Sequence, residues 1–240
     1  MDASALLSRL VSRLKGRSYE IDPRIDARYL GVVTLERAMM KLRGFYRFPL
    51  HTNRPFVGRG VGLRARHLLR CGPGVTLGDH SRVDAMSDKG VTLGAGTSLG
   101  RNSRIECIGN LRFLGVGFTA GDNVGLGTDC LYGAAGGITI GDDTIIGNFV
   151  SMHSEGHNYD DPDVPIRDQG VSHQGIRIGR GCWIGSKATV LDGVTLGDGS
   201  IVAAGAVLTA GAYPANGIYG GVPARLLKSR DPGEGTGTAG

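Results

Sequence analysis

Six aliphatic side chains stand six residues apart without a break in this chain: Ile178, Ile184, Val190, Leu196, Val202 and Leu208. The same step of six occurs upstream, first in Leu93, Leu99, Ile105 and Leu111 and then in Ile140, Ile146 and Met152. An amphipathic helix repeats its apolar residues every three or four positions, and a half-buried strand repeats them every two. A step of six instead predicts short strands joined by turns, with one large side chain per repeat in a shared core.

Small residues accompany these aliphatic residues. The residue that follows is often glycine or alanine: Gly94, Gly100, Gly141, Gly147, Gly179, Gly185, Gly197 and Ala203. The residue two positions before is small or β-branched: Thr144, Cys182, Ala188, Val194, Ser200 and Ala206. Small side chains let the chain turn without crowding, and glycine adopts backbone angles that strain other residues. A disordered glycine-rich chain would not keep its aliphatic residues in register, so we expect a folded, all-β protein.

The pattern resembles that of the hexapeptide-repeat acyltransferases over roughly residues 70–228. The resemblance implies a left-handed parallel β-helix of triangular section, an exception to the usual right-handed crossover. Three hexapeptides would make one coil, and coils would stack at the strand spacing of about 4.8 Å. Such coils need neighbours to bury their faces, and the two ends need caps.

The predicted organisation has three parts. Residues 1–70 form a basic N-terminal extension, which holds one or two helices, the second around residues 34–41, and an arginine-rich lead-in. Residues 71–228 form the β-helix domain, interrupted at residues 86–90 and by a loop at 154–175. The tail, 229–240, is expected to be disordered because it lacks apolar residues larger than alanine beyond Asp231.

Charge is distributed unevenly along the chain. Residues 1–70 contain fifteen Lys and Arg against five Asp and Glu, whereas the remainder contains twelve against seventeen. Apolar residues at helical spacing between Leu6 and Leu14 alternate with arginines and a lysine, which is typical of a basic amphipathic helix. That helix could contact an anionic membrane surface, or pack on the first coil or a neighbouring subunit. Nucleic acid is not an expected partner, because no recognisable reader motif is present.

Several features indicate a cytoplasmic protein. No run of eighteen apolar residues predicts a membrane-spanning helix, and the N-terminus carries Asp2 where a signal peptide needs positive charge. The four cysteines are far apart and do not follow a metal-binding spacing. We expect most of them to be buried small hydrophobic residues in a reducing compartment.

The loop at 154–175 is where the sequence places the chemistry. It breaks the six-residue step, contains two prolines and a cluster of acids, and lies next to or includes His153, His157 and His173. Loops carried by a rigid scaffold are the usual location of functional groups.

The motifs around this loop resemble those of the sugar and exopolysaccharide O-acetyltransferases of maltose, galactoside and colanic-acid type. The chain reads Thr-Ile-Gly at 139–141, Gly-His at 156–157 and Trp-Ile-Gly-Ser at 183–186. The resemblance implies that His157 is the general base, with a pKa near neutrality that suits removal of a hydroxyl proton. His153 is the alternative base. Ser186 would stabilise the oxyanion, and Asp160 or Asp161 would orient the imidazole, although a backbone carbonyl would serve equally well.

The resemblance also implies acetyl-CoA as the acyl donor, with no metal. The donor site would include Trp183, Ser186, Ala204, Gly205, Thr209, Arg225 and Lys228. The two basic residues belong to the segment Gly221-Val222-Pro223-Ala224-Arg225 and its continuation, and would lie near the CoA phosphates. Relatives commonly have lysine after the threonine, where this chain has Ala210.

The acceptor side departs from the galactoside pattern. An asparagine and an aspartate of those enzymes are replaced by Gly127 and Ala135, which leaves Asp129 and His153 as the polar candidates. The glycine-rich run at 133–137 would leave room for a larger glycan. We therefore expect a small-molecule or glycan acceptor, and the resemblance implies a homotrimer with sites between subunits.

Three other functions stay open. The first is serine or amino-sugar N-acetylation on the same fold. The second is a zinc enzyme of the γ-carbonic-anhydrase type, for which His153, His157 and His173 would supply three ligands. The third is a non-catalytic β-helix scaffold.

Overall fold

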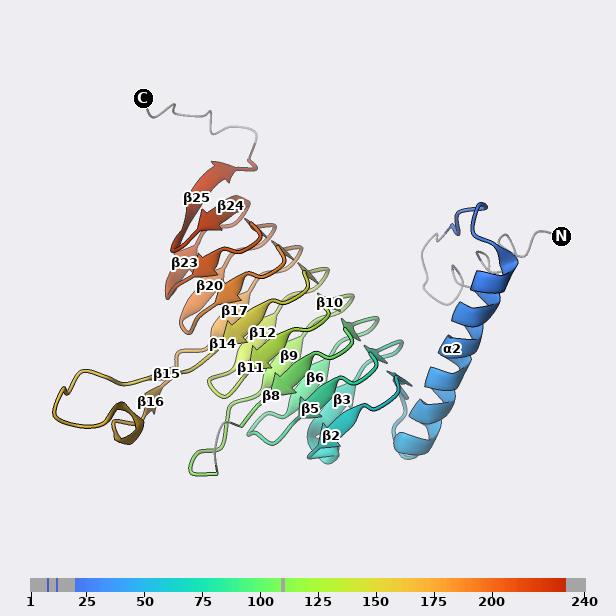
Figure 1. The fold of residues 1–240 in the computed structure, drawn as a ribbon, viewed down its shortest axis with the longest axis horizontal. Helices are drawn as coiled ribbons and strands as arrows, with labels where there is room; N and C mark the ends of the chain where they lie inside the picture. Colours follow the sequence, from blue (N-terminus) through green and yellow to red (C-terminus); the bar gives the residue numbers. More distant parts are fainter. Residues whose placement is uncertain (1–7, 9–11, 13–19, 109–110, 232–240) are drawn as a thin grey trace.

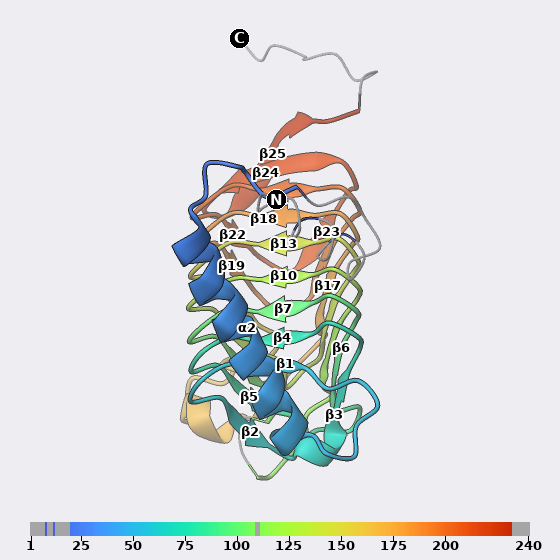
Figure 2. The ribbon, with the colours of Figure 1, turned by 90° about the vertical axis from the view of Figure 1, so that its right-hand side faces the viewer.

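The computed structural model describes residues 8, 12, 20–108 and 111–231 of the chain. Short parallel strands wind into a column of stacked coils, and one long helix lies beside the N-terminal end of that column (Figure 1). Each coil passes once through each of three sheets, which form the three faces of the column (Figure 2). The predicted all-β, left-handed parallel β-helix is confirmed.

The strands are short, and consecutive strands fall in consecutive sheets. The first sheet contains, in spatial order, β1 (Phe56–Val57), β4 (Thr76–Leu77), β7 (Ser98–Leu99), β10 (Gly125–Leu126), β13 (Ile145–Ile146), β18 (Trp183–Ile184), β21 (Ile201–Val202), β24 (Gly217–Gly221) and β25 (Ala224–Ser229). The second contains β2 (Gly62–Arg64), β5 (Arg82–Asp84), β8 (Arg104–Glu106), β11 (Leu131–Gly133), β14 (Ser151–His153), β19 (Thr189–Val190) and β22 (Val207–Leu208). The third contains β23 (Gly211–Tyr213), β20 (Val194–Leu196), β17 (Ile176–Ile178), β12 (Ile138–Ile140), β9 (Phe118–Ala120), β6 (Val91–Leu93) and β3 (Leu69–Cys71).

The turns that join the sheets are stacked on one another along the corners of the column. The first corner column links the first sheet to the second, and the second corner column links the second sheet to the third. Most turns are short, but the second corner column carries two long excursions, at residues 107–117 and 154–175. A two-stranded ladder and two short 3-10 helices, η1 (Arg66–Leu68) and η2 (Ile166–Asp168), also lie in this column.

The step of six in the sequence becomes three stacks of aliphatic side chains inside the column. On the first sheet Ile146 pairs with Ile184, and Ile184 pairs with Val202. The second and third sheets repeat this arrangement, and all nine residues of the two later runs are buried. Burying one large apolar side chain per strand in a continuous core is the main favourable term for such a fold.

The earliest run is an exception, because Leu111 is not a core residue. Its side chain is 97% exposed, whereas Leu93, Leu99 and Ile105 are buried. The chain leaves the column after Cys107 and rejoins it at Phe118, so Leu111 lies on the excursion. Leu111 belongs to none of the strands of the column, so its six-residue spacing from Ile105 is coincidental.

The column also begins earlier than the sequence predicted. Strands β1 and β2 pair with β4 and β5, so residues 56–70 are the first coil and not a lead-in. Their arginines lie on the outside, where Arg59 and Arg64 pair with acids of the next coil at 3.0 and 3.6 Å. The repeat in residues 56–70 was not recognised because arginines occupy its outward-facing positions, where a coil accepts polar residues.

Most of the glycines that follow the aliphatic residues occupy positions where a Cβ atom would overlap the backbone of the next coil. A Cβ atom at Gly147 would lie 2.6 Å from the backbone nitrogen of Ser186 in the next coil, and one at Gly127 would collide with the carbonyl oxygen of Gly147. The positive φ angles fall two residues later in each turn, for example at Asp129 and Phe149. The expectation that the glycines directly after the aliphatic residues adopt backbone angles that strain other residues is therefore wrong.

The long helix α2 (Ala27–Arg47) includes the predicted helix at 34–41. Asp26 caps its N-terminus by accepting a hydrogen bond from the Tyr29 backbone. Basic residues face the column: Arg43 and Arg47 donate to the carbonyl oxygens of Val57 and Val61. The C-terminal end of α2 adjoins β1, and its N-terminal end lies away from the column (Figure 1).

Large apolar residues on α2 are exposed. They lie three and four residues apart, as in an amphipathic helix whose apolar face is turned outward. We call them the outward stripe: Val32, Leu35, Met39, Leu42 and Tyr46. Within the described residues, no helix is both long enough and apolar enough to cross a membrane. The predicted amphipathic helix between Leu6 and Leu14 falls largely outside the described residues, as does the tail from 232.

The C-terminal end of the column is closed by a hairpin. Strand β25 runs antiparallel to β24, and the Val222–Pro223 peptide bond between them is cis. Because β25 is antiparallel, it ends the parallel stacking of the first sheet.

Replacing Gly127 by alanine tests the close stacking of the turns. We expect Gly127→Ala to lower the free energy of unfolding by about 1–3 kcal/mol, because its Cβ would overlap the backbone of the next coil. Gly125→Ala is the matched control, since a Cβ there meets no atom within 4 Å. Urea unfolding of the three proteins measures the difference, and equal losses in the two variants would contradict this account.

Candidate active site

The loop predicted to carry the chemistry leaves the column between β14 and β17. Its two ends form an antiparallel ladder of strands β15 (Gly156–His157) and β16 (Val171–Ser172), which extends away from the column (Figure 1). Gly156 pairs with Ser172, and His157 pairs with Val171. His157 therefore lies in the part of the loop nearest the column, on a regular strand backbone, and the His157 side chain is exposed to solvent.

Both ends of the loop are tied to the column. The buried hydroxyl of Ser154 donates to the Gly133 carbonyl oxygen at 2.8 Å and accepts from the Gly136 backbone N–H at 3.0 Å. At the other end the carboxylate of Asp192 accepts from the backbone N–H groups of Gln174 and Gly175, each at 2.8 Å or slightly more. These contacts hold the ladder in a defined position relative to the coils.

Gln169 closes the outer part of the loop, and sequence reasoning did not single it out. Its side-chain amide donates to the carbonyl oxygens of Asp161 and Val164, both at 2.7 Å, and accepts from the Asp161 backbone N–H at 3.1 Å. Asn158 adds a hydrogen bond from its side chain to the Gln169 carbonyl oxygen. A glutamine has no sequence signature for this role, because the partners are backbone groups.

The predicted orienting residue, Asp160, is exposed. Among the hydrogen bonds of the described residues, none joins Asp160 or Asp161 to the imidazole of His157. Asp161 is instead engaged within the loop, where its carboxylate accepts from the Asp163 backbone N–H at 3.0 Å. A carboxylate that holds the tautomer of His157 therefore stays a prediction.

Four predicted residues lie along the first corner column. Ser186 is exposed in the turn between β18 and β19, and the Gly205 backbone N–H donates to its carbonyl oxygen at 2.9 Å. Ala204 precedes Gly205 in the next turn, so these three residues form one continuous surface. Asp129 lies two coils earlier in the same column, and its carboxylate accepts from the Asn102 amide at 2.8 Å. That contact gives Asp129 a structural role in its turn.

The second sheet separates these residues from the loop. His157 belongs to the second corner column, whereas Ser186 and Gly205 belong to the first. His153 ends β14 and is exposed, and Thr209 follows β22. One chain by itself therefore does not bring the predicted base and the predicted oxyanion donor together.

The remaining donor-site candidates lie at the C-terminal end of the first sheet. Trp183 is 54% exposed on β18, in register with Ile145 and Ile201 of the neighbouring coils. Arg225 and Lys228 lie exposed on β25. These positions form an apolar strip followed by two cations along the face next to the first corner column.

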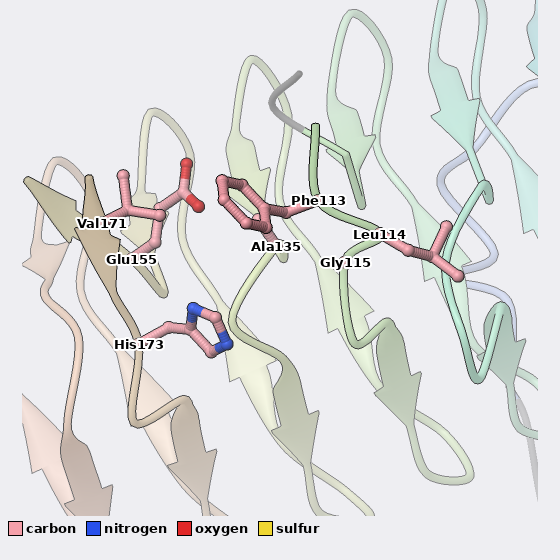
Figure 3. A pocket seen from close by; sticks show the side chains of 7 residues that line it. All are labelled: Phe113, Leu114, Gly115, Ala135, Glu155, Val171 and His173. Carbon is pink, nitrogen blue, oxygen red and sulfur yellow. The ribbon is translucent and has the colours of Figure 1, made fainter. Parts of the chain in front are cut away.

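Sequence reasoning missed a hollow beside the loop. It is a shallow depression that encloses about 20 Å³, room for about one water molecule, and it lies between the two excursions of the second corner column (Figure 3). Its lining comprises Phe113, Leu114, Gly115, Ala135, Glu155, Val171 and His173. The signal that could have revealed it is the excursion at 107–117, which the apparent register of Leu111 concealed.

The histidines predicted as alternative zinc ligands are not gathered into a metal site. No group of three or more His, Cys, Asp or Glu within the described residues could hold a metal ion. The four cysteines are free thiols, and three of them are buried as predicted. Burial raises the pKa of the Cys71 and Cys107 thiols to about 12, which keeps them protonated and unreactive near neutral pH.

Comparison with known proteins agrees with the repeat and the fold. Residues 175–210 match the bacterial transferase hexapeptide family, described as six repeats. A probable acetyltransferase of Mycobacterium tuberculosis is 33% identical over 122 residues, which are 51% of this chain and 38% of that protein. The chain thus spans well under half the length of this relative.

Solved structures with similar folds include two acyltransferases. A mutant of AntD, an N-acyltransferase from Bacillus cereus in complex with dTDP and coenzyme A, is 19% identical with a TM-score of 0.50, covering 65% of this chain and 84% of its own. A maltose O-acetyltransferase from Clostridium difficile 630 is 22% identical with a TM-score of 0.46, covering 69% and 72%. At this level of identity the likeness concerns the fold.

Gln169 offers a test of how the loop is held. We expect Gln169→Ala to speed hydrogen exchange and proteolysis within residues 159–168, because three hydrogen bonds that close the loop are lost. The melting temperature should change little, since the loop lies outside the core. Hydrogen-exchange mass spectrometry measures both regions at once. Gln174→Ala is the control, because Gln174 binds Asp192 through its backbone N–H and not its side chain.

Proposed function

We propose that this chain, whose repeats belong to the bacterial transferase hexapeptide family, is an acetyl-CoA-dependent acetyltransferase that modifies a hydroxyl of a saccharide or glycan precursor. The observation that carries the proposal is the placement of His157. Its imidazole is exposed on a short ladder whose two ends are fixed to the column by Ser154 and Asp192. A cytoplasmic location is part of this proposal.

The proposed reaction is direct transfer. His157 takes the proton of the acceptor hydroxyl as its oxygen attacks the thioester carbonyl carbon of acetyl-CoA. The resulting tetrahedral oxyanion collapses, the carbon–sulfur bond breaks, and the protonated histidine returns its proton to the CoA thiolate. An acyl-enzyme intermediate on cysteine is not part of this scheme, because burial raises the pKa of all four thiols.

The first corner column is the proposed donor side. Ser186, Ala204 and Gly205 present small side chains and exposed backbone, against which a narrow pantetheine chain can lie. Arg225 and Lys228 supply cations for the CoA phosphates, and Trp183 supplies an exposed aromatic face. The hydroxyl or backbone N–H of Ser186 would stabilise the oxyanion.

The separation of the two corner columns supports a site shared between subunits. If copies of the chain pack side by side around a threefold axis, the loop of one copy can meet the first corner column of the next. His157 would then face Ser186 of a neighbouring copy, which a single chain cannot achieve. The exposed outward stripe of α2 supports self-association as well, because contiguous exposed apolar residues usually mark an interface.

N-acetylation of an amino sugar is the second candidate. It uses the same donor and the same fold, and an amine needs a base to remove its proton just as a hydroxyl does. The AntD likeness is to an N-acyltransferase, but at 19% identity it bears on the fold alone.

Substitution of His157 tests the proposed reaction. We expect His157→Ala to lower the rate of acceptor-dependent thiol release from acetyl-CoA by about 10²–10⁴-fold, the usual contribution of a general base. Ellman's reagent suits the assay because the protein's own thiols are largely buried. Acetyl-CoA affinity should stay unchanged in this variant.

Two controls accompany this measurement. His67→Ala removes an exposed histidine far from the loop and should keep full activity. His153→Ala distinguishes the alternative base: if it abolishes transfer while His157→Ala does not, His153 is the base and the assignment of His157 is wrong.

Assembly gives a separate test. We expect light scattering after size exclusion to give about 75 kDa for the wild type, three times the 25.1 kDa chain. Leu35→Glu/Leu42→Glu should give a smaller species, because it places two charges in the outward stripe. Glu36→Lys is the control on the same helix. A monomeric wild type at tens of micromolar would contradict the shared-site model.

A further inference from the structure

The hollow beside the loop is formed by segments from three successive coils. The excursion at 107–117, the turn at 134–137 and the loop at 154–175 all belong to the second corner column. The Val116 backbone N–H donates to the Ala135 carbonyl oxygen at 2.8 Å, and the Gly136 N–H donates to Ser154. The walls of the hollow are thus held by hydrogen bonds to the turn between them.

Small residues form the floor. Gly115 and Ala135 contribute almost no side-chain volume where the two excursions approach each other. Next to them, a Cβ atom at Gly136 would lie 2.5 Å from the Cβ of His173 and would collide with the Ser154 carbonyl oxygen. The close approach of the loop to this turn depends on that glycine.

The walls differ in chemical character. Phe113 is 63% exposed and Leu114 is 55% exposed, so one wall is an aromatic and aliphatic surface that faces solvent. Figure 3 shows the Phe113 ring between Ala135 and the Glu155 carboxylate, with the His173 imidazole directed into the same space. Within the described residues, no ion pair involves Glu155.

The ladder places the proposed base on the same side as this hollow. Residues directly opposite each other in an antiparallel pair project to the same face, and alternate residues along one strand share a face. His157 is opposite Val171, which lines the hollow. Glu155 and His173 lie just beyond the two strands, two residues from His157 and Val171 respectively, and we infer that they project to the same face as His157.

We propose that the exposed surface around this hollow is the acceptor subsite and that one uncharged sugar ring lies across it. Phe113 would stack on the apolar C–H face of the ring. Glu155, an acceptor-only carboxylate, would take hydrogen bonds from ring hydroxyls. Among the described residues that line the hollow none is Lys or Arg, and Glu155 is negatively charged, so phosphorylated sugars and sugar nucleotides are disfavoured. This inference rests on the proposed acetyltransferase function, and it assigns residues that the sequence did not indicate.

Two variants test the subsite. Phe113→Ala and Glu155→Gln should each raise the KM for a neutral acceptor about tenfold or more, while the KM for acetyl-CoA stays within twofold. The acceptor panel consists of methyl glycosides and the corresponding sugar 1-phosphates, and the wild type should prefer the methyl glycosides. Tyr159→Ala is the matched control, because it removes an exposed aromatic ring from the same loop but outside the hollow.

The outcomes separate the two proposals. An active wild type whose acceptor KM is unchanged by both variants, or which prefers sugar phosphates, overturns the subsite and leaves the transferase intact. A wild type that neither binds acetyl-CoA nor releases thiol overturns the proposed function.

A binding measurement without turnover keeps the subsite testable in that case. Saturation-transfer NMR should detect methyl glycosides on the wild type and on Tyr159→Ala, and should lose the signal in Phe113→Ala. Equal signals, or no signal on the wild type, would overturn the subsite. Thermal melts of all variants establish that they are folded.

Discussion

The whole column depends on how closely the backbone of one turn lies on the backbone of the next. Strands of adjacent coils can pair only if the turns between them stack at the same spacing. In the first corner column this stacking leaves no room for a side chain at Gly127 or Gly147, which follow the aliphatic residues Leu126 and Ile146. The hydrogen bond from the Gly147 N–H to the Ile184 carbonyl oxygen, at 2.8 Å, runs through this contact. Glycine at these positions is therefore a steric requirement of the fold.

Much of the fold could be predicted from the sequence because the need for a small residue after each aliphatic residue recurs every six positions. The stacks of Ile146, Ile184 and Val202, with a small residue two positions earlier, gave the strand positions and the direction of each side chain. Leu111 was misread for the same reason: a spacing of six predicts a core residue only where the ladder continues. The first coil was missed because its outward arginines obscured a repeat that Val57 and Leu77 complete.

The candidate site was readable only in part. His157 stood out because its loop breaks the register and carries a recognisable motif. Phe113 and Glu155 did not stand out, since nothing in one sequence indicates that two excursions 40 or so residues apart share a corner of the column. Gln169 was missed because it acts on backbone groups. Within one chain Ser186 and His157 lie in different corner columns, a separation that the order of the residues in the sequence does not reveal.

The corner excursions have a consequence for how such a protein can diversify. Strand pairing constrains the coils on both sides of a turn, but a segment that leaves the column and returns to the same corner does not alter their register. The excursion at 107–117 and the loop at 154–175 are both of this kind. Their lengths and side chains can therefore change while the faces and the opposite corner stay as they are. Insertions and deletions at one corner can in this way give a β-helix new recognition surfaces. The core residues stay the same, because their packing does not depend on the excursions.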